Sequence, residues 1–479
     1  MLFKHLLAYL LPNLAQVIAS FGTVFILTRY LSNEGYGLFN DVFIKMTIFH
    51  YIFFTWAEAA AGRFFANARE ENNVANHFKT IFIAYFVNCL LFSLVVVVYL
   101  LISPSDIITR RALAAAFAGS IIRSLLKIAF ETRRMNLQAM RYAIVDGFHI
   151  IFGFILTAIS VVFLGFKQDG PFFATLIAGM CALGLELPDL VKSAKGGKFD
   201  KKLALSYIKF GYPISLNLIA AAILYTGDRL IMGPLLGHAQ VGIYSAGYQV
   251  AARIMDTFFL YVSSATFPLL VNAFESKDKD WFENTAKHNF SLRVGLGAPI
   301  AIGIALVAHP LCEILIGPSM REEAAKIAPY IAIASLILGV SDYFADAFML
   351  SKHVFERTIL MLFPVILNIA LNFTLLPKLG INGAIVATII AYIVSLTLMY
   401  WRGSKHVKLP VPLDEIVKII ISLIAMSAGV LLVPNWGAFI ELIAKAIVGA
   451  LIYGAMAYWL DFANAREMAN NILNKIRKA

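Results

Sequence analysis

The residues best suited to chemistry are charged side chains inside apolar runs. In the segment LYTGDRLIMG (residues 224–233), Asp228 and Arg229 stand side by side. In another run, Arg123 and Lys127 lie four residues apart, so a helix brings them to one face, and no acidic residue shares the middle of that run. Ionisable groups at membrane depth cost roughly a few kcal/mol each and usually face a cavity. Surplus positive charge in such a place predicts a site for a phosphate group or an acidic sugar.

The acidic residues predict a second kind of site. Asp342 and Asp346 lie four residues apart, so two like charges share one helix face, which suits a proton or a cation. Arg253 and Asp256 have the spacing of a helical ion pair. The residues predicted to bind substrate in a cationic cleft are Arg123, Lys127, Arg229, Arg253 and Lys45. The acids predicted to couple an ion or to brace the structure are Asp228, Asp256, Asp342, Asp346, Glu58 and Asp146. No catalytic or metal-binding residue is predicted.

Each of these candidates also has a structural interpretation. Asp228 and Arg229 lie shortly before Gly233, and an ion pair that fixes helix packing explains them as well as a ligand site does. The lone histidines His149 and His309 fit hydrogen-bonded packing groups. Charged side chains near helix ends extend their polar tips to the interface, which is expected of Glu186, Asp189, Lys445 and Arg29.

Composition identifies the surroundings that must hold these charges. The chain has 479 residues, of which 60% are hydrophobic and 14% are charged, and its mean hydropathy is +0.77. Soluble domains average about 45–50% apolar and about 25% charged residues. Apolar segments of about 20 residues, long enough to cross a bilayer, recur along the whole length. The polar stretches between them are too short for an independent soluble core.

We predict an all-α integral membrane protein with about fourteen transmembrane helices. The predicted spans are 6–28, 38–62, 80–102, 111–131, 140–165, 171–191, 207–232, 241–272, 289–316, 324–349, 357–376, 381–401, 413–433 and 437–460. Lysine and arginine concentrate in every second loop, which predicts that those loops and both termini are cytoplasmic. This bias accounts for much of the net charge of +11. Basic residues are spread over many short loops, so nucleic-acid binding is not expected.

Two pairs of segments indicate an internal repeat. DGPFFATLIAGM (169–180) matches NGAIVATIIAYI (382–393), and LSNEGYGLF (31–39) matches LGHAQVGIY (236–244). We interpret these as two homologous six-helix bundles, a parallel repeat whose lobes enclose a cleft for alternating access. The predicted organisation is a first lobe at 1–191, a basic cytoplasmic linker at 192–206, a second lobe at 207–401, two additional spans at 402–461 and a basic amphipathic cytoplasmic tail at 462–479.

The sequence resembles a known family through several segments. TRYLSNEGYGLF, GDRLIMGPLLGHAQVGIYSAGY and LLPKLGINGAIVAT are similar to the polysaccharide transporters (Wzx-type O-antigen and exopolysaccharide flippases) of the MOP flippase superfamily, whose fold is MATE-like. The resemblance implies translocation of an undecaprenyl-diphosphate-linked oligosaccharide to the outer leaflet through a cationic cleft. It implies coupling to H+ or Na+, no cofactor, and location in the cytoplasmic (inner) membrane. The expected partners are the lipid-linked glycan, membrane lipids, a glycan polymerase and other export components. No Walker A phosphate loop is present, so ATP-driven transport is not expected.

Other functions stay open at this point. A MATE-type multidrug or cation antiporter shares the expected fold, but the first span, LLAYLLPNLAQVIASFGTVFILT, lacks an acidic residue that proton-coupled members often carry there. A lipid II flippase also shares the fold, but the arginine-rich first helix usual in that group is absent. A membrane glycan polymerase or ligase would need a sizeable outer loop, and every outer loop here is short. The favoured interpretation is therefore a transporter and not an enzyme.

Overall fold

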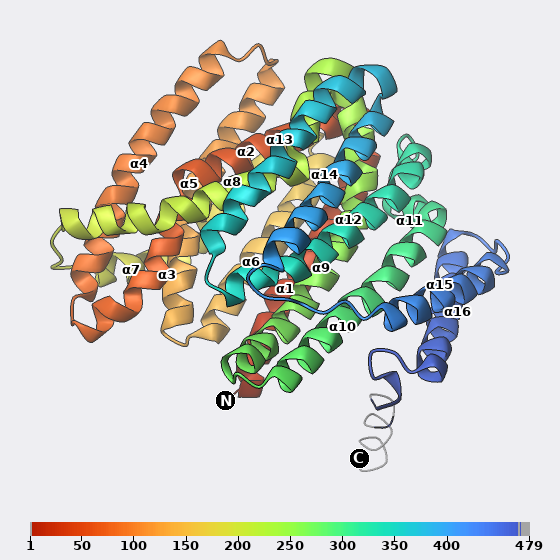
Figure 1. The fold of residues 1–479 in the computed structure, drawn as a ribbon. Coiled ribbons are helices and arrows are strands. Elements are labelled where there is room, and N and C mark those ends of the chain that lie inside the picture. Colours follow the sequence, from red (N-terminus) through yellow and green to blue (C-terminus); the bar gives the residue numbers. More distant parts are fainter. Residues whose placement is uncertain (1, 468–469, 471–479) are drawn as a thin grey trace. The chain divides into compact units, whose positions relative to one another are not determined.

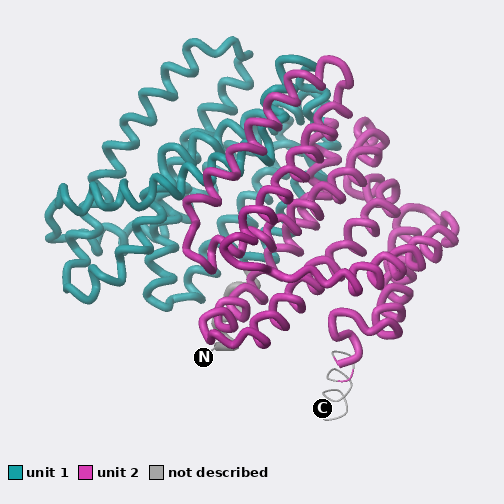
Figure 2. The backbone as a smooth tube through the Cα atoms, viewed as in Figure 1, with its two compact units in different colours: residues 1–242 teal, residues 243–479 magenta. Residues whose placement is uncertain are grey.

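The computed structural model describes residues 2–467 and 470, with side chains from Pro12 onward (Figure 1). All regular structure in this part of the chain is helical. Helix contacts divide the chain into two compact units, unit 1 at Met1–Gly242 and unit 2 at Ile243–Ala479 (Figure 2). The last residues of the predicted amphipathic tail, 468–469 and 471–479, lie outside the described residues.

The helices are given in chain order. Those that begin in unit 1 are α1 (Leu2–Tyr30), α2 (Asn33–Phe53), α3 (Thr55–Glu70), α4 (Val74–Ile102), α5 (Ile107–Met135), α6 (Ala139–Ala158), the π-helical turn η1 (Ile159–Phe163), α7 (Gly170–Ser193), α8 (Lys201–Leu236) and α9 (His238–Glu275), which continues into unit 2. The remaining helices are α10 (Lys279–Leu306), α11 (Ala308–Leu315), α12 (Arg321–Leu350), α13 (Val354–Leu379), α14 (Ile381–Gly403), α15 (Leu413–Leu431) and α16 (Ala438–Leu460).

Every predicted span corresponds to helical structure, and the predicted fold class is confirmed. Eleven described helices have the length and hydropathy of a membrane span. The other predicted spans correspond to α1, to α2 with α3, and to α15. The chain is therefore a multi-pass membrane protein. The domain limits predicted from the repeat place α8 in the second lobe. The helix contacts place α8 in unit 1, where it packs on α2 and α3. The predicted domain limits stay a prediction.

The second predicted span is broken at Phe54, between α2 and α3. In a straight helix, residues eight apart are separated by about 12 Å along the axis. The break brings His50 near the end of α2 to Glu58 in the first turn of α3, with 2.9 Å between His50 Nε2 and Glu58 Oε1. No proline or glycine lies at the break, so the local sequence does not predict it.

The ninth predicted span is broken at Val307, between α10 and α11. Pro310 explains this break, because a proline ring clashes with the carbonyl four residues earlier, here that of Leu306. Leu306 is the last residue of α10, and Pro310 lies in the first turn of α11, where proline is tolerated.

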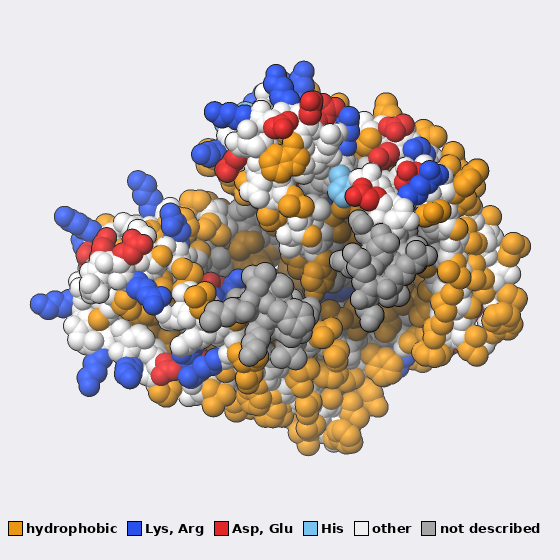
Figure 3. Space-filling view, turned by 90° about the horizontal axis from the view of Figure 1, so that it is seen from below, with side chains coloured by type: hydrophobic (Ala, Val, Ile, Leu, Met, Phe, Trp, Pro, Cys, Tyr) orange, Lys and Arg blue, Asp and Glu red, His pale blue; other side chains and the backbone are white. Residues whose placement is uncertain are grey.

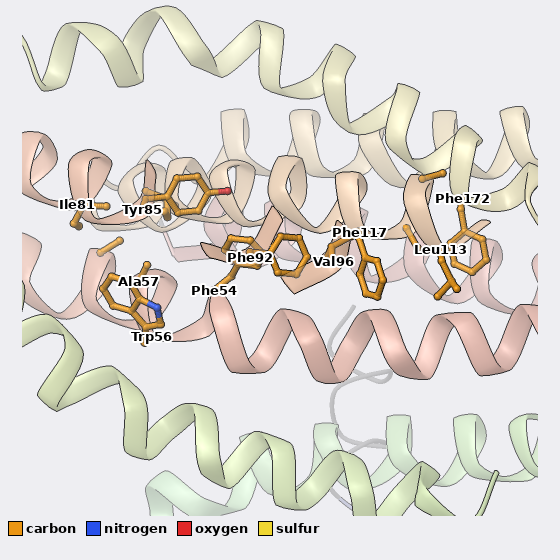
Figure 4. Packing of buried hydrophobic residues seen from close by; sticks show 14 of the residues in the cluster. Phe54, Trp56, Ala57, Ile81, Tyr85, Phe92, Val96, Leu113, Phe117 and Phe172 are labelled. Carbon is orange, nitrogen blue, oxygen red and sulfur yellow. The ribbon is translucent and has the colours of Figure 1, made fainter. Parts of the chain in front are cut away.

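Unit 1 has an aromatic core between α2, α3, α4, α5 and α7 (Figure 4). The Phe54 and Phe92 rings lie 4.9 Å apart and the Phe49 and Phe117 rings also 4.9 Å apart, within the range of favourable ring pairs. Tyr85 adds a polar contact, since its hydroxyl donates to the Ile121 carbonyl at 2.5 Å. This core fixes α3 and α5 against each other, and those two helices carry the charged side chains described below.

Unit 2 has two cores. One includes Tyr343 of α12, which is fully buried and donates to the carbonyls of Ala286 and Pro410 at 3.2 and 3.0 Å. The other holds the two additional helices on α10, where the Tyr453 hydroxyl of α16 donates to the Gly295 carbonyl at 2.6 Å. The Tyr453 hydroxyl supplies a partner to a carbonyl that its own helix leaves unpaired, because Pro299, four residues after Gly295, has no N–H.

The predicted repeat is visible in the helix packing. α6 packs on α7 and α5 on α7, as α13 packs on α14 and α12 on α14. The matched glycines meet inside unit 1: a Cβ on Gly37 would overlap the carbonyl oxygen of His238, and a Cβ on Gly242 would overlap that of Asn33. The two contacts are reciprocal, because the repeat pairs Gly37 with Gly242 and Asn33 with His238. Glycine is required at both positions for backbones to approach so closely.

The outer faces of the helices are apolar. α4 leaves large hydrophobic side chains exposed along its length, among them Phe86, Leu90, Leu94 and Leu101. Figure 3 shows one face of the molecule, where hydrophobic side chains form broad continuous areas and charged side chains gather in separate groups. Exposed apolar area of this extent is typical of surfaces that face lipid.

Candidate functional site

A charged cluster from three helices lies inside unit 1. The carboxylate of Glu58 (α3) is shared, with Oε1 2.9 Å from His50 Nε2 (α2) and Oε2 3.1 Å from Lys127 Nζ (α5). The side chains of His50 and Glu58 are 7% and 9% exposed, but that of Lys127 is 38% exposed. The cluster therefore has a buried acidic centre and a cation that a ligand can reach.

Arg123 extends this cluster along α5. It is exposed, and it forms no ion pair with any residue the structure describes within 12–467. It lies within electrostatic range of Asp146 and His149 on α6. Arg123 and Lys127 share one face of α5, as their spacing predicts, and of the two only Lys127 contacts a carboxylate at ion-pair distance among the described residues. This face can attract an anion.

Lys45 is placed differently. Its Nζ lies 2.5 Å from Oδ2 of the buried Asp41, one turn earlier on α2. The ammonium group is thus neutralised by a partner on its own helix, and Lys45 does not join the surplus cations of α5.

Asp228 and Arg229 are buried in α8, with 2% and 4% of their surfaces exposed. Asp228 Oδ1 accepts the Arg229 backbone N–H at 2.8 Å and lies 3.8 Å from Arg229 Nη1, which also donates to the Tyr225 carbonyl at 3.0 Å. In this conformation the arginine is held by its own helix. Its predicted contact with substrate would require a different conformation and stays a prediction.

In unit 2 the acids of α12 each have their own arginine. Asp346 Oδ2 lies 2.7 Å from Arg293 Nη2 of α10, and Asp342 Oδ1 lies 3.5 Å from Arg357 Nη2 of α13. The two carboxylates share a face, as predicted, but each has a cation as its nearest ionic partner. This arrangement favours the bracing role among the two roles considered for them.

Arg293 was not identified from sequence and is the most deeply buried arginine of this set. It is 1% exposed, its Nε donates to Asn289 Oδ1 at 3.0 Å, and its guanidinium lies 5.8 Å from the Tyr343 ring. The spacing of Asn289 and Arg293, four residues apart, is the signal that could have revealed it.

Arg253 and Asp256 are both exposed on α9. Asp256 lies within electrostatic range of Arg253 and of Asp342, but no ion pair within 4 Å joins Arg253 and Asp256 in the part of the chain that the structure describes. The spacing of a helical ion pair is present, while the contact is not made.

A polar patch in unit 2 was also missed. Asn372 Nδ2 of α13 donates to the Asn368 Oδ1 and carbonyl oxygens at 3.1 and 2.9 Å, and both residues are buried. α13 and α14 are antiparallel neighbours with Gly383 packed on the Leu375 backbone, which brings Thr388 about level with Asn372. The Asn372 Oδ1 and Thr388 Oγ1 atoms are buried without hydrogen-bond partners among the described residues.

Of the charged groups expected to extend toward the interface, Glu186 is instead buried and Lys445 is half-buried. Glu186 is 1% exposed and accepts from Arg133 Nε at 2.7 Å and from Arg141 Nε at 2.9 Å, with Arg133 also bonded to Asp189. Lys445 Nζ lies 2.6 Å from Glu441 Oε1, and the two side chains are 14% and 9% exposed. Tertiary packing placed arginines of α5 and α6 beside Glu186, so the expectation for Glu186 was wrong. Lys445 pairs with Glu441 on its own helix, and the expectation for Lys445 stays a prediction.

The amino-acid sequence is similar to known protein families and to curated proteins. A family model described as "Polysaccharide biosynthesis protein" matches residues 2–274, and a model described as "Lipid II flippase MurJ" matches residues 243–437. Two curated relatives come from Haloferax volcanii. The probable flippase AglR is 23% identical over 67% of this chain and 67% of its own length. The probable low-salt glycan biosynthesis flippase Agl15 is 24% identical over 71% of this chain and 69% of its own length.

Solved structures share the fold. The lipid II flippase MurJ in an inward closed conformation superposes with a TM-score of 0.76 at 15% identity, covering 95% of this chain and 98% of that chain. An inward-facing multidrug resistance MATE family transporter of the MOP superfamily gives a TM-score of 0.67 at 13% identity, covering 84% of this chain and 97% of that chain. At these identities the likeness concerns the fold alone.

Proposed function

Because this chain belongs to the polysaccharide biosynthesis protein family, we propose that it is a flippase for a lipid-linked oligosaccharide, carried on undecaprenyl diphosphate and moved across the cytoplasmic membrane by alternating access. The family membership predicted from the sequence segments is confirmed. The proposal extends it to the substrate and the mechanism.

One observation carries the proposal: the surplus cations on α5. Lys127 is partly exposed although it is paired with Glu58, and Arg123 is exposed without an ion pair among the described residues. A diphosphate needs positive charge on its route, and charged hydrogen bonds to phosphate oxygens are among the strongest that proteins make. A lipid tail can remain in the bilayer along the apolar outer faces while the polar head passes through the protein.

The relatives support a glycan as cargo. Both archaeal relatives carry the name of a probable flippase, and one is named for glycan biosynthesis. A lipid II flippase is a second candidate, favoured by the family match over 243–437 and by the MurJ-like fold. The multidrug interpretation rests on the shared fold alone, whereas family models support the glycan and lipid II interpretations.

We further propose that an H+ or Na+ gradient drives transport without a cofactor. Carboxylates in both units supply sites for a proton, and the oxygens of Asn372 and Thr388 are ligands of the kind that alkali cations take. The chain would catalyse no covalent reaction, would have both termini in the cytoplasm, and would work with a glycan polymerase and other export components.

The test is flipping in reconstituted vesicles. A fluorescent undecaprenyl-diphosphate oligosaccharide is placed in proteoliposomes, and its access to a membrane-impermeant quencher is followed. We expect the purified protein to speed the crossing at least tenfold, and Lys127→Gln to lose most of that rate, since a charged hydrogen bond contributes about 1.5–3 kcal/mol. Lys326→Gln, on an exposed side chain of α12, is the matched control and should leave the rate unchanged. Equal rates in protein-free vesicles would contradict the proposal, and export of a cationic dye in its place would favour the multidrug alternative.

A further inference from the structure

In unit 1 the carboxylate of Glu58 contacts two basic side chains at once. Each oxygen of Glu58 has a different ionic partner, His50 for Oε1 and Lys127 for Oε2. His50 is 5% exposed, and neither of its ring nitrogens has a hydrogen-bond partner among the described residues, although Nε2 lies 2.9 Å from Glu58 Oε1. A neutral imidazole keeps a lone pair on one of its two ring nitrogens, and that buried lone pair is a place where a proton can bind.

The groups around this pair come from three helices. α5 contributes Lys127, Arg123 and Ser124, of which only Lys127 contacts the carboxylate at ion-pair distance. α4 contributes Tyr85, whose hydroxyl is already bonded to the Ile121 carbonyl. α6 contributes Asp146 and His149, which lie within electrostatic range of Arg123. Lys127 is therefore the partner of Glu58 that an incoming anion can remove.

Removal of Lys127 from Glu58 would leave a buried carboxylate with a neutral imidazole as its remaining contact. A buried charge that loses its partner is strongly unfavourable. Uptake of a proton by the His50–Glu58 pair restores one positive charge beside the carboxylate, or neutralises the carboxylate itself, and removes that cost.

We propose that the His50–Glu58 pair binds one proton when a diphosphate draws Lys127 away from Glu58, and releases it when Lys127 returns. The proton comes from water on the side to which the cluster is open and goes back to water, so one anion and one proton bind together. This inference rests on the proposed function, since it takes the substrate's diphosphate as the anion.

The experiment measures protons taken up with a bound anion. Calorimetric titration of the purified full-length protein with inorganic pyrophosphate, in two buffers of different ionisation enthalpy near pH 7, gives the protons exchanged per ion bound. The proton change of pyrophosphate itself is common to all variants. We expect the wild type to take up about one proton more than His50→Gln and Glu58→Gln do. His149→Gln, on neighbouring α6, is the matched control and should keep the wild-type value.

A second measurement on the wild type alone avoids any folding defect of the variants. Pyrophosphate gains negative charge as the pH rises from 6 to 8, so a simple cationic site would bind it more tightly at higher pH. Linked proton uptake predicts the opposite sign, with affinity falling by up to about tenfold per pH unit. Binding that strengthens with pH, or equal proton uptake in wild type and His50→Gln, overturns this inference but not the proposed function. Absence of pyrophosphate binding, or binding that Lys127→Gln does not weaken, overturns both.

Discussion

The two units share a helix arrangement but hold interior charge in opposite ways. In unit 2, Asp346 and Asp342 each have an arginine, Arg293 and Arg357, as ionic partner. In unit 1, Glu58 is shared by His50 and Lys127, and Arg123 on the same helix face is exposed. The repeat gives both units a similar packing of helices. Which unit can bind a ligand depends instead on which charged side chains have an ionic partner and which remain accessible.

Burial explains what the two arrangements can do. Arg293 is 1% exposed and hydrogen-bonded to Asn289 as well as to Asp346, so an anion from outside cannot reach it. Lys127 is 38% exposed, and exchange of Glu58 for another anion requires only a side-chain movement. We therefore assign bracing to the Arg293–Asp346 pair of unit 2 and ligand binding to Lys127 and Arg123 of unit 1, and this contrast can be tested.

The largest expected effect is on stability in unit 2. Arg293→Met removes the cation from Asp346 and should lower the free energy of unfolding by about 3–5 kcal/mol, the usual cost of breaking a buried pair. Unfolding by SDS titration from mixed micelles measures it. The double variant Arg293→Met with Asp346→Leu removes both charges and should recover a large part of the loss. A loss below about 1 kcal/mol in the single variant would show that this pair does not brace the unit.

The next effect is on transport, and it compares exposed arginines of the two units. Arg123→Gln should slow flipping about tenfold with little change in stability, because its side chain is exposed and has no ion pair among the described residues to lose. Arg253→Gln, exposed on α9, is the matched change in unit 2 and should have a smaller effect. The vesicle assay measures both. Equal losses in the two variants would remove the contrast between the units.

The sequence predicted the membrane spans well because a run of about 20 apolar residues has few alternatives in a bilayer. The breaks were harder to predict. Pro310 marks the end of α10 by a known steric clash, and could have been used. The break at Phe54 has no such residue, and Phe54 itself is buried in the aromatic core.

The candidate site was predicted where local spacing decides it. Arg123 and Lys127 share a face because they lie on one helix. His50 was missed because helical spacing separates it from Glu58, and only the break at Phe54 brings them together. Arg293 was missed because it lies near the start of its predicted span, where basic residues are expected for topology, while its partner Asp346 is 53 residues away in sequence.

The smallest expected effect lies outside the interior and should be the same in both units. Asp106 caps α5 by accepting the N–H groups of Ile108 and Thr109, and Asp278 caps α10 by accepting that of Trp281. Replacing either with alanine should cost about 1 kcal/mol in SDS unfolding.

The pH dependence of the Asp106 variant sharpens this last test. The Thr109 hydroxyl and backbone N–H groups hold the pKa of Asp106 below its usual range. A carboxylate with a lowered folded-state pKa contributes stability that is present above its unfolded pKa of about 3.9 and is lost as the pH falls through the folded value. The difference between wild type and Asp106→Ala should therefore be full at pH 7 and shrink below about pH 4. Asp106→Ala and Asp278→Ala should lower the free energy of unfolding by similar amounts. A large difference between these two losses would show that the units differ in general stability, and the contrast between their interior charges would then not explain the results.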